Sequence, residues 1–150
     1  MDNDTIDVLQ DLIKTSNDGQ KGYQAAAEDV KSPEIRAFLT AGAQRCGEGA
    51  IELSHLLRAL GKEPPEGGTA AGALHRGWLQ IKAGVTTTDL AIIEECERGE
   101  DRAKAVYKKA LEKNLNADVR FVIERQYQGV LENHDRVHAL RDRLREGAVV

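Results

Sequence analysis

Hydrophobic residues recur at alternating steps of three and four positions through most of the chain, a spacing that places them on one face of an α-helix. Four long segments show this pattern and predict helices at residues 5–30, 33–60, 88–113 and 117–145. The seam of the first helix, meaning its stripe of core-facing positions, contains Ile6, Leu9, Ile13, Ser16, Gln20, Tyr23, Ala27 and Val30. The pattern therefore predicts an all-α fold.

Residues typical of helix ends stand at the breaks between these segments. Ser32 can accept a hydrogen bond from the first turn of the second helix, and Pro33 suits its first position, where no N–H donor is needed. Gly61 can end that helix, and a threonine among residues 86–88 can cap the next long one. The predicted boundaries therefore depend on capping chemistry as well as on periodicity.

The connections between the helices favour a four-helix bundle. Two are tight turns, whereas the connection between the second and third long helices has room for a short extra helix, predicted at residues 70–83. That connection is long enough to run the length of a bundle helix, about 40 Å at about 1.5 Å per residue. We expect one domain over residues 1–150, with two antiparallel hairpins joined by a crossover in the ferritin-like arrangement. The short helix could instead cap one end of the bundle.

Two short blocks recur in the two halves of the chain. Residues 16–20, Ser-Asn-Asp-Gly-Gln, parallel residues 96–100, Cys-Glu-Arg-Gly-Glu. Residues 33–36, Pro-Glu-Ile-Arg, parallel residues 117–120, Ala-Asp-Val-Arg. A duplicated helical hairpin is the expected origin of such a repeat, which supports a pseudo-symmetric bundle.

Charge and composition narrow the function classes. The chain has 25 acidic and 21 basic residues, a formal net charge of -4, and nucleic-acid affinity comes from neutralising phosphates with basic side chains. No stretch approaches the roughly 20 apolar residues of a membrane helix, and the N-terminus lacks the basic and apolar regions of a signal peptide. We therefore expect a protein that binds neither nucleic acid nor membrane.

Polar residues on the seams are the candidates for chemistry, because an unpaired buried polar atom costs about 1–3 kcal/mol. Gln20 and Glu100 occupy equivalent seam positions of the first and third long helices, and Gln126 and Asn133 lie on the seam of the last. Among the many charges of residues 94–102, only Glu100 falls on the apolar stripe. Cys46 and Cys96 are also on seams and are expected to act as small buried hydrophobes.

Two sequence pairs have the spacing of metal ligands. Glu52 and His55 form a Glu-x-x-His pair, and Asp135 and His138 form its aspartate version. Residues three apart project from one helix face, and carboxylate-bridged di-iron and di-manganese bundles combine such pairs with single glutamates from the other two helices. Glu100 is a candidate for one single carboxylate, and iron or manganese is the expected metal.

This set of ligands is incomplete in two respects. The first helix lacks the second single glutamate, and the candidate ligands do not lie at the same level along the bundle axis. Gln20, a poorer ligand, stands where the second glutamate is needed, while Asp18 and Glu28 fall off the seam. Alternative ligands at closer levels or beside the seam are Glu48, Glu132 and His134. The competing interpretation is that all these side chains are solvated residues on the flanks of the helical stripes.

Seven glycines lie within the long predicted helices, although each costs up to about 1 kcal/mol relative to alanine there. They are Gly19, Gly22, Gly42, Gly47, Gly49, Gly99 and Gly129. Glycine allows the backbones of two helices to approach closely, and it also leaves room for a ligand, water or metal. Both explanations are open from the sequence.

Three blocks of the chain resemble a known family. Residues 18–23, 72–78 and 97–101, DGQKGY, GALHRGW and ERGED, are similar to the characteristic blocks of an uncharacterised bacterial family of four-helix-bundle proteins in the ferritin-like superfamily. The similarity extends over nearly the whole chain. It implies a ferritin-like bundle in a cytoplasmic bacterial protein, sometimes discussed in connection with stress, and it brings no established activity.

Carrying ferritin-type ligands over by this resemblance selects Glu52, His55, Glu100, Asp135 and His138, with Gln20 in place of the expected helix-one glutamate. One hypothesis is therefore a protein that binds iron or manganese within the bundle, in a stress or metal-handling role. The other is a non-enzymatic helical module without metal, a homo-oligomer and most simply a dimer. Whether the protein is an enzyme is left open by both.

Overall fold

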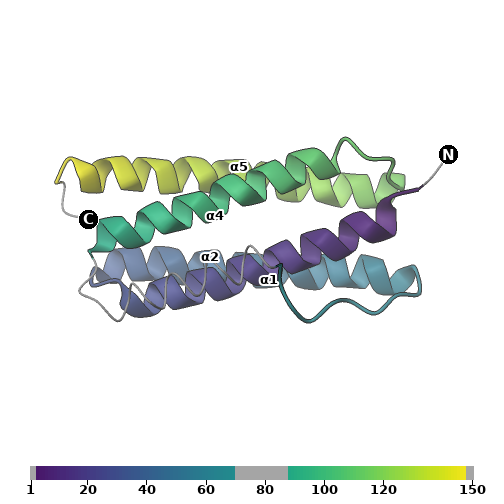
Figure 1. Ribbon diagram of the computed structural model, residues 1–150, viewed down its shortest axis with the longest axis horizontal. Helices are drawn as coiled ribbons and strands as arrows, with labels where there is room; N and C mark the ends of the chain where they lie inside the picture. Colours follow the sequence, from purple (N-terminus) through teal and green to yellow (C-terminus); the bar gives the residue numbers. More distant parts are fainter. Residues whose placement is uncertain (1–2, 70–87, 148–150) are drawn as a thin grey trace.

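The computed structural model describes residues 3–69 and 88–147. In these ranges the chain forms four long helices: α1 (Thr5–Asp29), α2 (Pro33–Ala59), α4 (Asp89–Ala110) and α5 (Ala117–Arg145). Figure 1 shows them packed as a four-helix bundle made of the α1–α2 and α4–α5 hairpins. No β-strand occurs in either range, so the predicted all-α four-helix bundle is confirmed. The short helix predicted at residues 70–83 lies outside the described residues.

The helix boundaries follow the capping chemistry. Ser32 Oγ accepts a hydrogen bond from the Ile35 N–H over 3.3 Å, and Thr88 Oγ1 accepts one from the Ala91 N–H over 3.2 Å, as predicted. The predicted end of the third long helix at residue 113 is wrong, because α4 ends at Ala110. The amides of residues 112 and 113 bond carbonyls three residues back, a tighter turn than the α-helix allows.

Two arginines confirm that the sequence repeat has a structural counterpart. Arg36 donates hydrogen bonds of 2.9 and 2.6 Å to two backbone carbonyls at the end of α1. Arg120 donates hydrogen bonds of 2.8 and 2.6 Å to two carbonyls that follow Ala110 at the end of α4. The last carbonyls of a helix have no partner within the helix. Each hairpin therefore uses the same arginine, four residues into its second helix, to complete the end of its first.

The two hairpins are joined at both ends of the bundle. The Asp89 carboxylate at the start of α4 accepts hydrogen bonds from the amides of Lys31 and Ser32 in the α1–α2 turn, over 2.8 and 3.0 Å. At the opposite end, the Asp4 amide donates to the Asn114 carbonyl over 3.0 Å. Since α2 ends at that opposite end (Figure 1) and α4 begins beside the α1–α2 turn, α2 and α4 run in the same direction. This is the direction expected for two antiparallel hairpins, and most of the connection between them lies outside the described residues.

The buried apolar side chains form two separate clusters. The first packs at the end of the bundle that holds the α1–α2 turn and contains Tyr23, Ala26, Ala27, Val30, Ile35, Leu39, Ala43, Ile92, Ile93, Cys96, Val137 and Leu140. The second packs near the α4–α5 turn and contains Val8, Leu9, Leu12, Ile13, Leu53, Leu57, Tyr107, Ala110, Leu115, Val119 and Ile123. Apolar packing thus stabilises both ends of the bundle, while its middle layer is built differently.

In the described ranges, none of the four helices combines the length and the apolar character needed to cross a bilayer.

Candidate functional site

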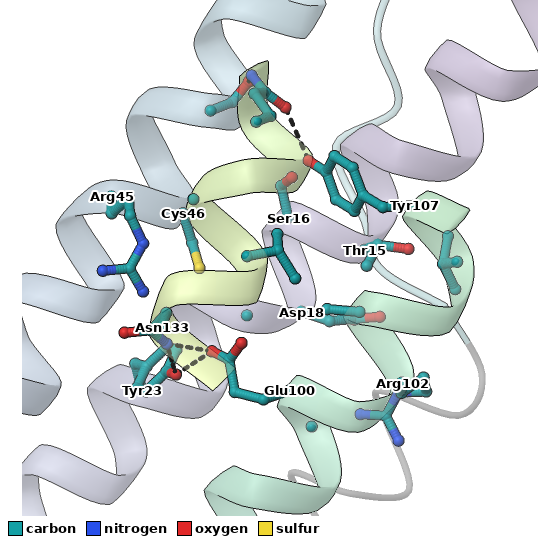
Figure 2. A pocket seen from close by; sticks show the side chains of 18 of the residues that line it. Thr15, Ser16, Asp18, Tyr23, Arg45, Cys46, Glu100, Arg102, Tyr107 and Asn133 are labelled. Atoms are coloured by element: carbon teal, nitrogen blue, oxygen red, sulfur yellow. Dashed lines mark hydrogen bonds between the residues drawn. The ribbon is translucent and has the colours of Figure 1, made fainter. Parts of the chain in front are cut away.

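A cavity of about 620 Å³ occupies the middle layer, between the two apolar clusters. All four helices line it, and the lining mixes small residues with polar ones (Figure 2). Its polar lining residues include Ser16, Asp18, Tyr23, Arg45, Glu48, Glu52, Glu100, Arg102, Tyr107, Arg125, Gln126 and Asn133. The middle layer thus combines open space with polar side chains, whereas the two ends of the bundle are packed with apolar ones.

Glu100 is a buried acidic residue of this layer, with only 7% of its surface exposed. Its Oε1 atom accepts a hydrogen bond from the Tyr23 hydroxyl and another, 2.5 Å long, from Asn133 Nδ2. Asn133 Nδ2 also donates to the Tyr23 hydroxyl over 2.6 Å. The three side chains come from α4, α1 and α5, and Figure 2 shows them meeting at one edge of the cavity.

Burial sets the proton affinities of these groups. Desolvation raises the pKa of Glu100, although the hydrogen bonds from Tyr23 and Asn133 lower it in part. Burial also raises the pKa of Tyr23 well above its ordinary value, and the neighbouring Glu100 charge adds to the effect. The Tyr23 hydroxyl therefore stays protonated throughout the neutral pH range and donates its hydrogen bond to Glu100.

A second series of hydrogen-bonded side chains runs along the cavity wall from α4 through α5 to α2. The Tyr107 hydroxyl donates to Gln126 Oε1 over 2.7 Å, which leaves Gln126 Nε2 to donate to Glu52 Oε1 over 2.7 Å. The same nitrogen donates to the Gly49 carbonyl over 3.3 Å, and Glu52 forms an ion pair with Arg125. Because each member has a fixed partner, Gln126 and Glu52 are held in one orientation.

Two acidic residues are buried that the sequence pattern placed elsewhere. Asp18, expected off the seam, is only 8% exposed and lines the cavity, where its carboxylate accepts hydrogen bonds from the Thr69 amide and hydroxyl. Glu95, expected on a solvated face, is only 4% exposed and pairs with Arg98. The expectation that Glu100 alone among residues 94–102 lies on the buried face is therefore wrong. The periodic pattern identifies the apolar stripe of each helix, whereas Asp18 and Glu95 are buried although they lie outside that stripe.

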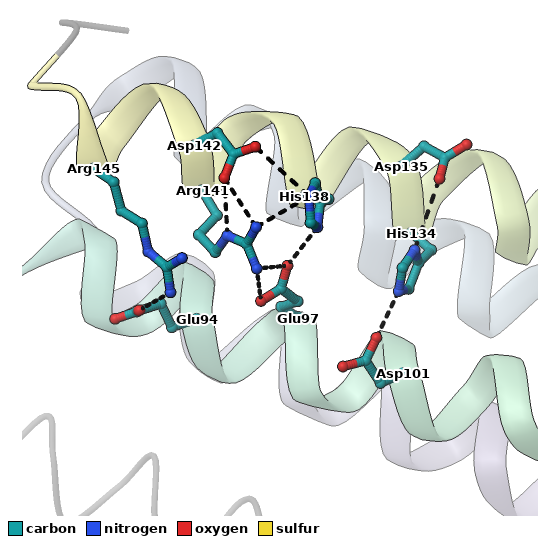
Figure 3. Close-up of polar contacts among 9 residues, drawn as sticks. All are labelled: Glu94, Glu97, Asp101, His134, Asp135, His138, Arg141, Asp142 and Arg145. Atoms are coloured by element: carbon teal, nitrogen blue, oxygen red, sulfur yellow. Dashed lines mark hydrogen bonds and ion pairs between the residues drawn. The ribbon is translucent and has the colours of Figure 1, made fainter.

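The predicted metal ligands lie in different places. Glu52 and Glu100 line the cavity, whereas His55, Asp135 and His138 are exposed. Figure 3 shows the last two on the outer face formed by α4 and α5. His138 Nδ1 lies 3.1 Å from Glu97 Oε2 and its Nε2 lies 3.6 Å from Asp142 Oδ2.

The alternative ligands are similarly dispersed. Gln20 lies against Gly47 in a groove between α1 and α2 and does not line the central cavity. Glu48 is exposed and lies at the cavity wall, where its Oε1 atom accepts a hydrogen bond from Gln44 over 3.2 Å. Glu132 is exposed, and His134 pairs with Asp101 on the outer face over 2.5 Å (Figure 3). Within residues 3–69 and 88–147, no group of three or more histidine, cysteine, aspartate or glutamate side chains is placed to hold a metal ion. Metal binding stays a prediction.

The two cysteines behave as the sequence predicts for buried thiols. Both line the cavity, Cys96 is buried and Cys46 is half-buried. Desolvation and the Glu100 charge raise the pKa of each thiol to about 12, so both stay protonated at neutral pH. A protonated thiol is a poor nucleophile.

The helical glycines fall into two groups, of which the first confirms the close approach of two helices. A Cβ atom at Gly42 would lie 3.1 Å from the Tyr23 ring, and one at Gly19 would lie 2.8 Å from Cys46 Sγ, so these glycines allow α1 and α2 to approach closely. By contrast, a Cβ at Gly129 would meet nothing within 4 Å, and this glycine lines the cavity. Gly129 thus leaves space that a side chain would occupy.

Most of the chain matches a known protein family. Residues 4–113 match the family model of a domain of unknown function, DUF2383. The chain belongs to the DUF2383 family. The matched DUF2383 region includes α1, α2 and α4, and with them Glu100, Tyr23 and Asp18. It ends before α5, which supplies Asn133, Gln126 and Gly129 to the cavity of this DUF2383 member. A comparison with curated proteins finds no match.

Proposed function

We propose that this protein binds a small organic molecule in the central cavity. The observation that carries the proposal is the cavity itself, about 620 Å³ in the middle of a bundle whose two ends are closely packed. Ligand pockets have volumes of about 300–1,000 Å³ and combine apolar walls with a few placed polar groups. The cavity meets both conditions, because its wall contains apolar residues such as Val106 and Val130 together with polar ones such as Glu100.

The polar walls support recognition of a specific ligand. Glu100 is held by Tyr23 and Asn133, and Gln126 is held by Tyr107 and Glu52. Side chains fixed by such partners lose little conformational freedom when a ligand arrives, which favours affinity and specificity. The proposal is a binding protein, and it assigns no reaction to the site.

The test uses a neutral probe and a variant that fills the cavity. 2-Naphthylmethanol is titrated into the purified protein by calorimetry. Gly129→Leu is expected to weaken binding at least about tenfold, a change of about 1.4 kcal/mol, because its side chain enters open space in the cavity. Ala139→Leu is the matched control, since residue 139 is exposed on the same helix, and it is expected to bind the probe like the wild type.

Two results would count against the proposal. One is the absence of heat and of any shift in thermal stability with this probe and with its charged analogues, 2-naphthylmethylamine and 2-naphthoate, at millimolar concentration. The other is binding that Gly129→Leu leaves unchanged while the variant keeps its helical circular dichroism. Either result would mean that the cavity is not the binding site.

Iron or manganese within a ferritin-like bundle is the second candidate, favoured by the resemblance and by the acidic side chains that line the cavity, Glu52 and Glu100 among them. In the described part of the chain no histidine lines this cavity, and Glu52 is already paired with Arg125. These residues do not fit a resident di-metal centre. Metal analysis of protein purified without chelator separates the candidates: stoichiometric metal that Glu100→Ala removes would favour the second.

A further inference from the structure

The Glu100 carboxylate has one oxygen engaged and one that is not. Oε1 accepts hydrogen bonds from Tyr23 and Asn133, whereas none of residues 3–69 and 88–147 donates one to Oε2. Figure 2 shows this second oxygen directed away from the Tyr23–Asn133 pair. The side chain is 7% exposed and lines the cavity, so Oε2 is available to a molecule inside it.

The other acidic side chains of the cavity wall already have hydrogen-bond partners. Glu48 is exposed and accepts from Gln44. Glu52 is paired with Arg125 and accepts from Gln126, and Asp18 accepts from the Thr69 amide and hydroxyl. In contrast, no lysine, arginine or histidine of the described chain forms an ion pair with Glu100. Buried charges in proteins are normally paired, and Glu100, only 7% exposed, has no cationic partner in the described chain.

Two arginines line the same cavity, but neither supplies that cation. Figure 2 shows Arg45 on α2 and Arg102 on α4, on different sides of the space. The positive charge of Arg45 acts on Glu100 from a distance and lowers its pKa in part. The position beside Glu100 Oε2 is thus left for a group carried by the ligand.

We propose that the ligand carries a protonated amine, which binds Glu100 Oε2 while the apolar part of the molecule fills the space beside Gly129 and Val130. An ammonium group provides both the hydrogen-bond donor and the positive charge that this carboxylate lacks. A charge-assisted hydrogen bond is about twice as strong as one between neutral groups. This inference rests on the proposed function and names the class of ligand.

Three probes with the same ring system isolate the charge. 2-Naphthylmethylamine is cationic at pH 7, 2-naphthylmethanol is neutral, and 2-naphthoate is anionic. Calorimetric titration of the wild type is expected to give about tenfold or tighter binding of the amine than of the alcohol, the usual effect of a charged hydrogen bond. The naphthoate is expected to bind weakest, because Glu100 repels it.

Two isosteric variants assign this preference to one residue. Glu100→Gln keeps an Oε1 acceptor for Tyr23 and Asn133 and removes the charge, so the amine and the alcohol are expected to bind within about twofold of each other. Asp101→Asn removes an equal charge one position along α4, where Asp101 is exposed and pairs with His134 outside the cavity. It is expected to retain the wild-type preference.

The outcomes distinguish this inference from the proposed function. Equal binding of amine and alcohol, both blocked by Gly129→Leu, would overturn the amine and leave the cavity as a ligand site. Tightest binding by the naphthoate would assign recognition to the arginines and also overturn the amine. If the wild type binds Mn²⁺, shows no preference for the amine, and loses Mn²⁺ binding in Glu100→Gln, then Glu100 is a metal ligand and the amine is overturned. Failure of all three probes to bind would overturn the proposed function and this inference with it.

Discussion

Asn133 on α5 donates a hydrogen bond of 2.6 Å to the hydroxyl of Tyr23 on α1, in the other hairpin. Both side chains also donate to Glu100 Oε1 on α4, so one carboxylate oxygen joins three helices. This contact lies beside the cavity. The two hairpins are therefore connected by polar groups at the level where apolar packing is interrupted.

Tyr23→Phe tests the energy of this contact. The variant removes the donor to Glu100 Oε1 and the acceptor of Asn133, and it is expected to lower the free energy of unfolding by about 1–2 kcal/mol. Urea denaturation at neutral pH measures it. Tyr127→Phe is the matched control, because Tyr127 packs at the edge of the second apolar cluster and its hydroxyl has no hydrogen-bond partner in the described chain. A change within about 0.5 kcal/mol is expected there, and equal effects of the two variants would contradict the prediction.

Glu100→Gln tests the pH dependence of stability. Because burial raises the pKa of Glu100 from its ordinary 4.5, the folded protein holds this proton more tightly than the unfolded chain does. The carboxyl therefore contributes its full stability below pH 4.5 and loses that contribution as the pH rises through the folded pKa. The glutamine cannot titrate. The free energy of unfolding of the wild type, relative to the variant, is thus expected to fall as pH rises and then to level off.

Urea denaturation of both proteins between about pH 4 and 8 measures this difference. Subtracting the variant from the wild type removes the contributions of the other carboxylates, which both proteins share. A difference that stays constant over the range, or one that grows with rising pH, would mean that the pKa of Glu100 is not raised in the folded state.

Gly129→Ala and Gly42→Ala separate the two roles of helical glycine. The first adds a methyl group where nothing lies within 4 Å, so it is expected to raise the free energy of unfolding by about 0.5–1 kcal/mol through helix propensity. The second places the methyl group 3.1 Å from the Tyr23 ring, and it is expected to be at least about 1 kcal/mol less stable than the first. Denaturant titration measures both, and equal stabilities would contradict the assignment.

Arg36→Ala and Arg120→Ala test the repeated contact at the helix ends. Each is expected to lower the free energy of unfolding by about 1–2 kcal/mol, because two helix-end carbonyls lose charged donors. The effects should add in the double variant, since the two sites lie at opposite ends of the bundle. Arg143→Ala, an exposed arginine on α5 without a hydrogen bond in the described chain, is expected to change little. If Arg143→Ala lowered the free energy of unfolding as much as Arg36→Ala does, the assignment would be contradicted.

Much of the fold could be predicted because its determinants are local. The starts of α2 and α4 follow from Ser32, Pro33 and Thr88, whose side chains or ring act on amides within the first turn. The repeated Arg36 and Arg120 were visible as similar blocks, and they act on the helix end just before them. Helix periodicity also placed Glu100, Gln126 and Asn133 on the buried face.

The predicted metal ligands show where such reasoning stops. A pair such as Asp135 and His138 shares one helix face by spacing alone, but spacing does not say whether that face turns inward, and both residues are exposed. Gln20 and Glu100 occupy equivalent positions in the repeat, yet Gln20 lies in the groove beside Gly47 and Glu100 lines the cavity. Rotation of a helix about its axis by a fraction of a turn decides between these outcomes.

The sequence by itself determined four helices, their main boundaries, their pairing into two hairpins and the set of polar residues on their inner faces. Only the tertiary structure decided that the core divides into two clusters around a cavity, that Tyr23 and Asn133 converge on Glu100, and that Asp18 is buried. The physical reason is the distance along the chain over which each interaction acts. Caps and periodicity act within one or two turns of a helix, whereas a cavity depends on the rotation and axial register of four helices at once.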